Sequence, residues 1–215
     1  MNEIRVGAVL AGMLGLAMAA GCNTPDNPTP RGNPLAQEGN TMVTQPEARS
    51  VTMKGQRMSL AGADLAVGQQ APDAALSGND MKEVKLSSYR GKVVILSSVP
   101  SLDTPVCSRE THRFNQEAAG LGDNIAILTI SMDLPFAQKR WCGAEGVDKV
   151  VTLSDHKDAS FGKAYGVLMP DIRLLARALF VVDRAGVVRY KQVVPEISQE
   201  PDYEPVLAAA RKLAR

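Results

Sequence analysis

The sequence predicts an α/β domain built around a mixed β-sheet. Three short apolar runs, residues 92–99, 124–131 and 149–153, have the composition of strands that are buried on both faces. Segments with helical start and stop signals separate these runs, and a hairpin and an Ala-rich helix close the chain. Strands that alternate with helices indicate parallel pairing, and the terminal hairpin adds antiparallel strands.

The first 21 residues have the pattern of an export signal. Residues 6–20 carry no charge, and a run of 15 residues is too short to span a bilayer but suits the apolar region of a signal peptide. The run ends in Ala-Ala-Gly before Cys22, which resembles the lipobox of bacterial lipoproteins, where the cysteine is lipidated. We therefore expect an exported lipoprotein that meets the membrane only through its lipid anchor. Cleavage after Ala19 is the alternative, and it would leave Cys22 as a free thiol.

A linker is expected between this signal and the domain. Residues 22–50 hold five prolines and no aromatic residue, and Asn, Thr and Gln fill much of the remainder. Such a segment buries too little apolar surface to offset the entropy of ordering it. We expect residues 22–50 to be a disordered tether and residues 51–215 to form the folded domain.

The first elements of the domain follow from local turn and capping signals. Residues 51–60 alternate around Gly55, which is typical of a small N-terminal β-hairpin. After the strand at 92–99, a helix over 104–120 is expected to begin with Thr104 at its N-cap and Pro105 at its first position.

The remaining elements are predicted in the same way. A short helix over 135–143 also starts with proline, and residues 160–166 suit a single helical turn. The strands 178–183 and 187–194 flank a turn that contains glycine, as in a hairpin. An Ala-rich helix over 205–215 ends the chain.

Charge and metal-binding patterns exclude several functions. The chain has 24 basic and 23 acidic residues, so it lacks the basic surface that nucleic acids or anionic lipids require. His112 lies five residues after Cys107, about 140° round the predicted helix, so the two side chains do not converge on a metal. We expect no metal and no cofactor.

Cys107 is the strongest candidate for a reactive group. It falls in the first turn of the predicted helix, where unpaired amides and the helix dipole favour the thiolate form. Cys142 follows 35 residues later, and an oxidising compartment would allow these two thiols to pair. On this evidence alone, a structural disulfide is the default interpretation of two cysteines in an exported protein.

Two motifs carry a resemblance to a known family. The pattern P-x-x-x-T-x-x-C, formed by Pro100, Thr104 and Cys107, resembles the active-site motif of peroxiredoxins. The segment SMDLPFAQKRWCGAEG at residues 131–146 is similar to the signature of bacterial thiol peroxidases of the atypical two-cysteine type. The resemblance extends from about residue 51 to the C-terminus. It implies a thioredoxin-like fold and a thiol-dependent peroxidase.

The resemblance also implies a role for each motif residue. Cys107 corresponds to the peroxidatic cysteine, which becomes a sulfenic acid, and Cys142 to the resolving cysteine, which condenses with it into an intramolecular Cys107–Cys142 disulfide. Thr104 would donate a hydrogen bond to the peroxide, and Arg177 would place its charge near the sulfur. Pro100 would shield the thiol from water. A hydroperoxide substrate, a thioredoxin-like reductant and a homodimer are the partners that the family implies.

Two other functions remain open at this point. A thiol–disulfide oxidoreductase acting on proteins usually needs C-x-x-C, whereas Cys107 is followed by Ser108, Arg109 and Glu110. A non-enzymatic exported lipoprotein would need only a structural disulfide. In the resembling family the two cysteine helices partly unravel to form the disulfide, so we expect the Cys142 helix to have low local stability.

Overall fold

A computed structural model describes residues 49–215 of the chain. The predicted signal, the predicted lipidation site Cys22 and nearly all of the predicted linker lie outside the described residues. Within residues 49–215, no helix has the length and apolar character needed to cross a membrane.

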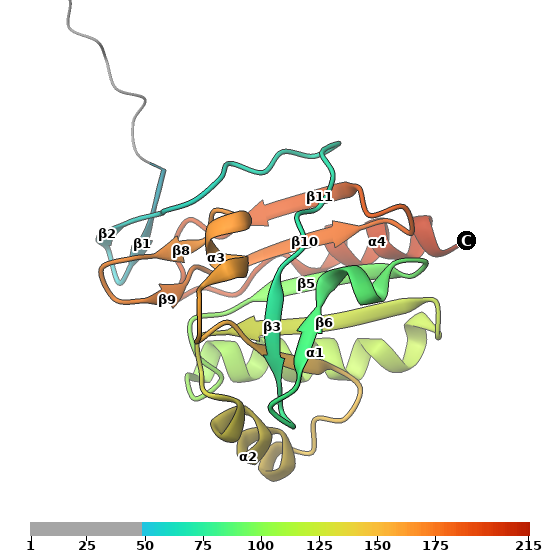
Figure 1. Cartoon of the computed structure of the whole chain (residues 1–215), viewed down its shortest axis with the longest axis horizontal. Coiled ribbons are helices and arrows are strands. Elements are labelled where there is room, and N and C mark those ends of the chain that lie inside the picture. The colour runs from blue at the N-terminus through green and yellow to red at the C-terminus, as the bar shows by residue number, and fades with distance from the viewer. Residues whose placement is uncertain (1–48) are drawn as a thin grey trace, which may run out of the picture. The chain divides into compact units, whose positions relative to one another are not determined.

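The predicted mixed sheet is confirmed, and it has seven strands in the spatial order β11-β10-β5-β6-β7-β3-β4 (Figure 1). The central strands β5, β6 and β7 are parallel, and the other neighbours pair antiparallel. Their bounds are β3 Ala75–Gly78, β4 Glu83–Lys85, β5 Val93–Ser98, β6 Ile125–Ser131, β7 Val151–Ser154, β10 Ala178–Val182 and β11 Val188–Val193. Only β3 and β4 were not expected, because they are short and contain few apolar residues.

Three helices cover one face of the sheet. These are α1 (Pro105–Leu121), α2 (Pro135–Glu145) and α4 (Tyr203–Ala214), and all three contribute to one apolar cluster (Figure 1). Side chains alternate across a strand, so β5 sends Val93 and Ile95 into this cluster. The helix ends agree with the sequence prediction to within two residues. The extension of α2 reflects Gly146, which caps it in the left-handed conformation.

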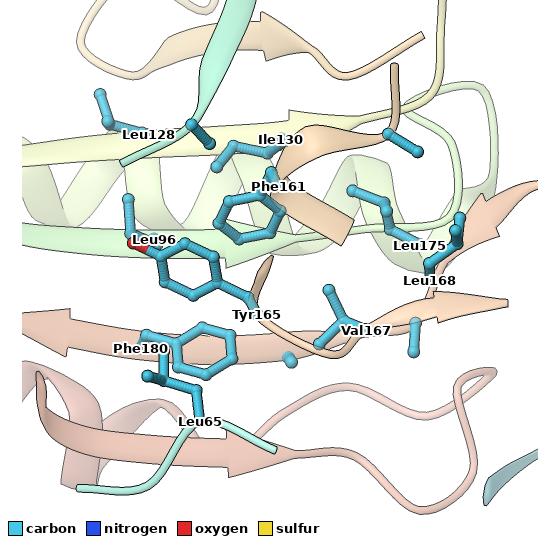
Figure 2. Close-up of a cluster of buried hydrophobic side chains, with 14 of the residues drawn as sticks. Leu65, Leu96, Leu128, Ile130, Phe161, Tyr165, Val167, Leu168, Leu175 and Phe180 are labelled. Atoms are coloured by element: carbon cyan, nitrogen blue, oxygen red, sulfur yellow. The ribbon is translucent and has the colours of Figure 1, made fainter. Parts of the chain in front are cut away.

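A second apolar cluster lies on the opposite face of the sheet. The short helix α3 (Ser160–Ala164) places Phe161 against Tyr165, with ring centroids 4.3 Å apart, and Phe180 of β10 meets both rings edge-on (Figure 2). The strands β8 (Leu168–Met169) and β9 (Leu174–Leu175) and the 3₁₀ helix η1 (Leu86–Tyr89) also contribute to this cluster. The sheet is therefore covered on both faces, which explains why β5 is buried along its whole length.

The predicted N-terminal hairpin is confirmed as β1 (Ser50–Met53) and β2 (Gln56–Ser59). Glu196, from the loop after β11, fastens its turn to the domain. The Glu196 carboxylate accepts hydrogen bonds from the amides of Lys54 and Gly55, at 2.9 and 3.0 Å. A further bond of 2.9 Å comes from the Thr52 hydroxyl.

Arg49, the first described residue, anchors the chain just before the hairpin. Its guanidinium donates hydrogen bonds to the carbonyl oxygens of Gly166 and Gly62, at 2.9 and 2.8 Å. Gly166 has a φ of 65°, and a Cβ at this position would overlap the carbonyl oxygen of Ala63 and the Arg49 guanidinium. Glycine is therefore required at position 166 both for its backbone conformation and for the close approach of Arg49.

Candidate active site

Cys107 lies in the first turn of α1, the helix that follows strand β5. The helix begins at Pro105, as predicted, so Cys107 occupies its third position. Its side chain is fully buried, and Thr111 donates a hydrogen bond of 2.9 Å to its carbonyl oxygen one turn later. The thiol is therefore held inside the domain at a helix N-terminus, where the dipole favours negative charge.

Arg177 provides the partner of the Cys107 sulfur. It immediately precedes β10, and its side chain is only 1% exposed. The guanidinium uses three nitrogens: Nη2 donates to Cys107 Sγ at 3.2 Å, Nε to the carbonyl of Ile197 at 3.0 Å, and Nη1 to the Glu110 carboxylate. Burial alone would lower the pKa of Arg177, but the negative charges of Glu110 and Cys107 outweigh it and raise this pKa. The cation is thus fixed in place beside the thiol.

Glu110 is a member of the site that the sequence analysis missed. It is fully buried, binds Arg177, and accepts a hydrogen bond of 2.6 Å from the Ser97 hydroxyl of β5. Burial raises the pKa of Glu110, while Arg177 and Ser97 act in the opposite direction. One signal in the sequence could have revealed Glu110. The buried side of α1 has residues at helical spacing, namely Cys107, Glu110 and Phe114. A carboxylate among them needs a buried partner.

Thr104 occupies the predicted N-cap, but the expected capping role is wrong. Its backbone is extended, as an N-cap requires, yet its side chain makes no capping hydrogen bond. A tight turn instead brings the carbonyl oxygen of Ser101 close, and the Thr104 hydroxyl donates to it at 3.0 Å. Thr104 is exposed, whereas Cys107, three residues later, is buried. Pro100 is buried in the same connection, two residues after β5 ends.

Asp133 shapes the loop that leads to the reactive thiol. It follows β6, and its carboxylate accepts hydrogen bonds from the Ser101 hydroxyl at 2.7 Å and the Leu102 amide at 2.8 Å. The Ser131 hydroxyl binds the same carboxylate at 2.7 Å and accepts a bond of 2.9 Å from Gln138 of α2. One partly buried network therefore connects the loop before α1 with the first turn of α2.

Cys142 lies on α2, and its sulfur has a different partner from the Cys107 sulfur. Its Sγ is 3.3 Å from the Thr152 hydroxyl of β7, whereas Cys107 Sγ is 3.2 Å from Arg177 Nη2. Both cysteines are free thiols, and both belong to the apolar cluster between the helices and the sheet. A disulfide between them therefore requires each sulfur to leave its present partner.

Comparison with known proteins gives the family. The model of the redoxin family matches residues 66–207. The chain is 53% identical to the thiol peroxidase of Oceanobacillus iheyensis over 163 residues, which cover 76% of this chain and 99% of that protein. This chain belongs to the thiol peroxidases of the redoxin family. A second thiol peroxidase, from Bacillus subtilis, is 51% identical over 77% of this chain and 98% of its own length.

Solved structures confirm the thioredoxin-like fold of this thiol peroxidase family member. A crystal structure of a peroxiredoxin-like protein from Aquifex aeolicus superposes with a TM-score of 0.73 at 40% identity, over 77% of this chain and 98% of the other. The thiol peroxidase of Chromobacterium violaceum shares the fold at 20% identity, with a TM-score of 0.66 over 76% of this chain and 94% of that one.

Proposed function

We propose that this thiol peroxidase reduces hydrogen peroxide and organic hydroperoxides with Cys107 as the peroxidatic thiolate. The observation that carries this assignment is the 3.2 Å contact between Arg177 Nη2 and the fully buried Cys107 Sγ. A permanently charged guanidinium stabilises the thiolate relative to the thiol, and the start of α1 acts in the same direction. The thiolate, and not the thiol, is the nucleophile.

The site supports a direct displacement on the peroxide. The Cys107 thiolate attacks one peroxide oxygen, so that an S–O bond forms as the O–O bond breaks, and the leaving oxygen takes up a proton as water or alcohol. Arg177 stabilises the charge that moves onto the oxygens, and its bond to Glu110 holds it in position. Thr104 would donate to the bound peroxide, which requires its hydroxyl to rotate away from Ser101. Buried Pro100 would exclude water.

We assign Cys142 as the resolving cysteine. Its sulfur attacks the Cys107 sulfenic acid, a disulfide forms and water leaves. A thioredoxin-like dithiol then reduces the disulfide and restores both thiols. The separate surroundings of the two sulfurs, beside Arg177 and Thr152, mean that this step includes a conformational change.

Peroxide consumption in the presence of thioredoxin, its reductase and NADPH tests these assignments. We expect Cys107→Ser to abolish turnover, and Cys142→Ser to stop after one equivalent of peroxide with a sulfenic acid on Cys107. Unchanged turnover in Cys107→Ser would refute the proposal in favour of a structural disulfide. Reduction of a protein disulfide substrate without peroxide consumption would favour the protein oxidoreductase. Sedimentation of the reduced and oxidised enzyme would test the homodimer, which we propose from the family.

We further propose export and lipidation at Cys22. The support is the apolar run and lipobox-like sequence before Cys22, together with the greater length of this chain relative to its relatives. The alignment that covers 99% of the Oceanobacillus iheyensis protein leaves about a quarter of this chain without a counterpart. Labelling with a fatty-acid analogue in an expressing bacterium would test the anchor. Incorporation into the native chain but not into Cys22→Ala is expected, and equal labelling of both would contradict it.

A further inference from the structure

His112 connects the helix of Cys107 with the helix of Cys142. It lies on α1, and its Nε2 is 3.0 Å from the Glu145 carboxylate at the end of α2. The His112 ring also packs on Trp141, with ring centroids 5.7 Å apart at 55°. One side chain of α1 thus contacts the residue directly before Cys142 and the last residue of the helix that carries it.

The last turn of α2 has few other attachments. The helix has 11 residues, and isolated helices shorter than about 12–15 residues are marginal in water, so its stability comes from packing. Its first turn is fixed to the sheet by Gln138, which donates to Ser131 and to the Leu153 carbonyl. Near the other end, Gly143 lacks a side chain and is exposed. Trp141 is the buried anchor there, only 8% exposed, and it is the residue on which His112 packs.

We propose that His112 is a positioning residue that sets the rate of disulfide formation, an inference that rests on the proposed function. Cys142 must leave Thr152 before it can reach the Cys107 sulfenic acid, and the turn from Trp141 to Glu145 must open for this to happen. His112 bonds to Glu145 and packs on Trp141, so it holds that turn closed. His112 takes no part in the bonds made or broken: the reaction joins sulfenic acid and thiol into disulfide and water. It controls how long the sulfenic acid survives.

Trp141 provides the readout, because it is the only tryptophan of the chain. After reduced full-length enzyme is mixed with hydrogen peroxide, stopped-flow fluorescence should show two phases. The rate of the first is proportional to peroxide and reports attack by Cys107, whereas the second is independent of peroxide and reports disulfide formation. Acid quenching, thiol alkylation and mass spectrometry of the same samples assign each phase to a chemical species, independently of the fluorescence of the tryptophan.

Two variants separate the contacts that His112 makes with Glu145 and Trp141, and a third variant is the control. Glu145→Gln removes the carboxylate from the contact with His112, and His112→Ala removes this contact and the ring contact with Trp141. We expect the second phase to accelerate roughly two- to fivefold in Glu145→Gln. In His112→Ala it should accelerate on the order of tenfold. The control is Arg113→Gln, at the residue after His112. Arg113 forms ion pairs with Glu117 and Glu204, neither of which lies on α2, so its replacement should leave both phases unchanged.

The phases distinguish failure of this inference from failure of the proposed function. The first phase should stay the same in all variants, and less sulfinic acid should accumulate in His112→Ala under excess peroxide because the sulfenic acid is consumed sooner. An unchanged or slower second phase in both Glu145→Gln and His112→Ala would overturn the role of His112 alone. Absence of both phases in the native enzyme would overturn the proposed function and this inference with it.

Discussion

Replacing Arg177 by methionine tests whether this residue serves the thiol or only the fold. Its side chain is 1% exposed and bonded to Glu110, which is fully buried, so Arg177→Met leaves a carboxylate in the interior without its counter-ion. Breaking a buried ion pair from one side costs about 3–5 kcal/mol. The second variant, Arg177→Met with Glu110→Leu, removes the orphaned charge as well. We expect it to recover most of this loss, since an apolar pair can replace a buried ion pair at little cost.

The peroxidase activity should not recover together with the stability. A hydrogen bond from a charged donor contributes about 1.5–3 kcal/mol, which corresponds to a loss of roughly 10- to 150-fold when it stabilises the reacting thiolate. We expect this loss in both variants, because both lack the Nη2 contact with Cys107. Arg177→Lys is the matched control: it keeps the charge but cannot bond Ile197, Glu110 and Cys107 together, so its activity should be intermediate.

Two measurements on the reduced proteins decide the outcome. Urea unfolding gives the free energy of unfolding, and the rate of sulfenic acid formation under limiting peroxide gives the activity. Recovery of native peroxide reactivity in the double variant would refute the catalytic role of Arg177, and it would make the residue a structural partner of Glu110. Equal stability of Arg177→Met and the native protein would refute the energetic argument.

Three further predictions concern the site support and the hairpin. Ser97→Ala removes the hydrogen bond to Glu110 and should lower the free energy of unfolding by about 1–3 kcal/mol in urea titrations, because a buried carboxylate oxygen loses its partner; no loss would show that this bond contributes nothing. Hydrogen bonds from the Ser198 hydroxyl and the Gly55 amide lower the pKa of Glu196 below its ordinary 4.5, so its stabilisation is present above that pH and is lost as the pH falls through the folded-state pKa. Thermal melts of Glu196→Gln should therefore lose less stability on acidification than the native protein, and parallel curves would contradict this. In the same melts, Gly166→Ala should lower the stability of the protein more than Gly55→Ala does. Both glycines have positive φ, but only at Gly166 would a Cβ overlap other atoms. Similar losses of stability in the two variants would show that this crowding is unimportant.

The sequence predicted the elements whose physical signals are local. The strand β5 has an apolar sequence because it is buried on both faces. The helix α1 begins at Pro105, directly after Thr104, whose backbone is extended. The strands β3 and β4 had no such signal, since they have only three or four residues, which include serine, glycine and charged side chains. They form because β3 pairs with the edge of β7 and β4 then pairs with β3. Tertiary pairing decided their structure.

The same distinction applies to the site. The motif residues Cys107 and Thr104 are close in the sequence. Arg177 was assigned near the sulfur by resemblance to the family, and its Nη2 lies 3.2 Å from Cys107 Sγ. Glu110 was missed because a glutamate on a helix is usually solvated, and its burial depends on Arg177, which is 67 residues away. The sequence placed Thr104 at the N-cap, but capping preferences alone could not predict the turn in which its hydroxyl donates to the Ser101 carbonyl.

The anchor at Arg49 has a mechanical consequence if the preceding segment is a membrane tether. Any pull transmitted along that segment reaches Arg49 before it reaches β1. There the guanidinium holds two backbone carbonyls, and the Arg49 carbonyl accepts a hydrogen bond of 2.8 Å from the Leu60 amide. Tension would therefore pass into the loops around Gly62 and Gly166 and spare the hairpin from being peeled open. The helices α1 and α2, on the opposite face of the sheet from α3, would carry none of that load directly.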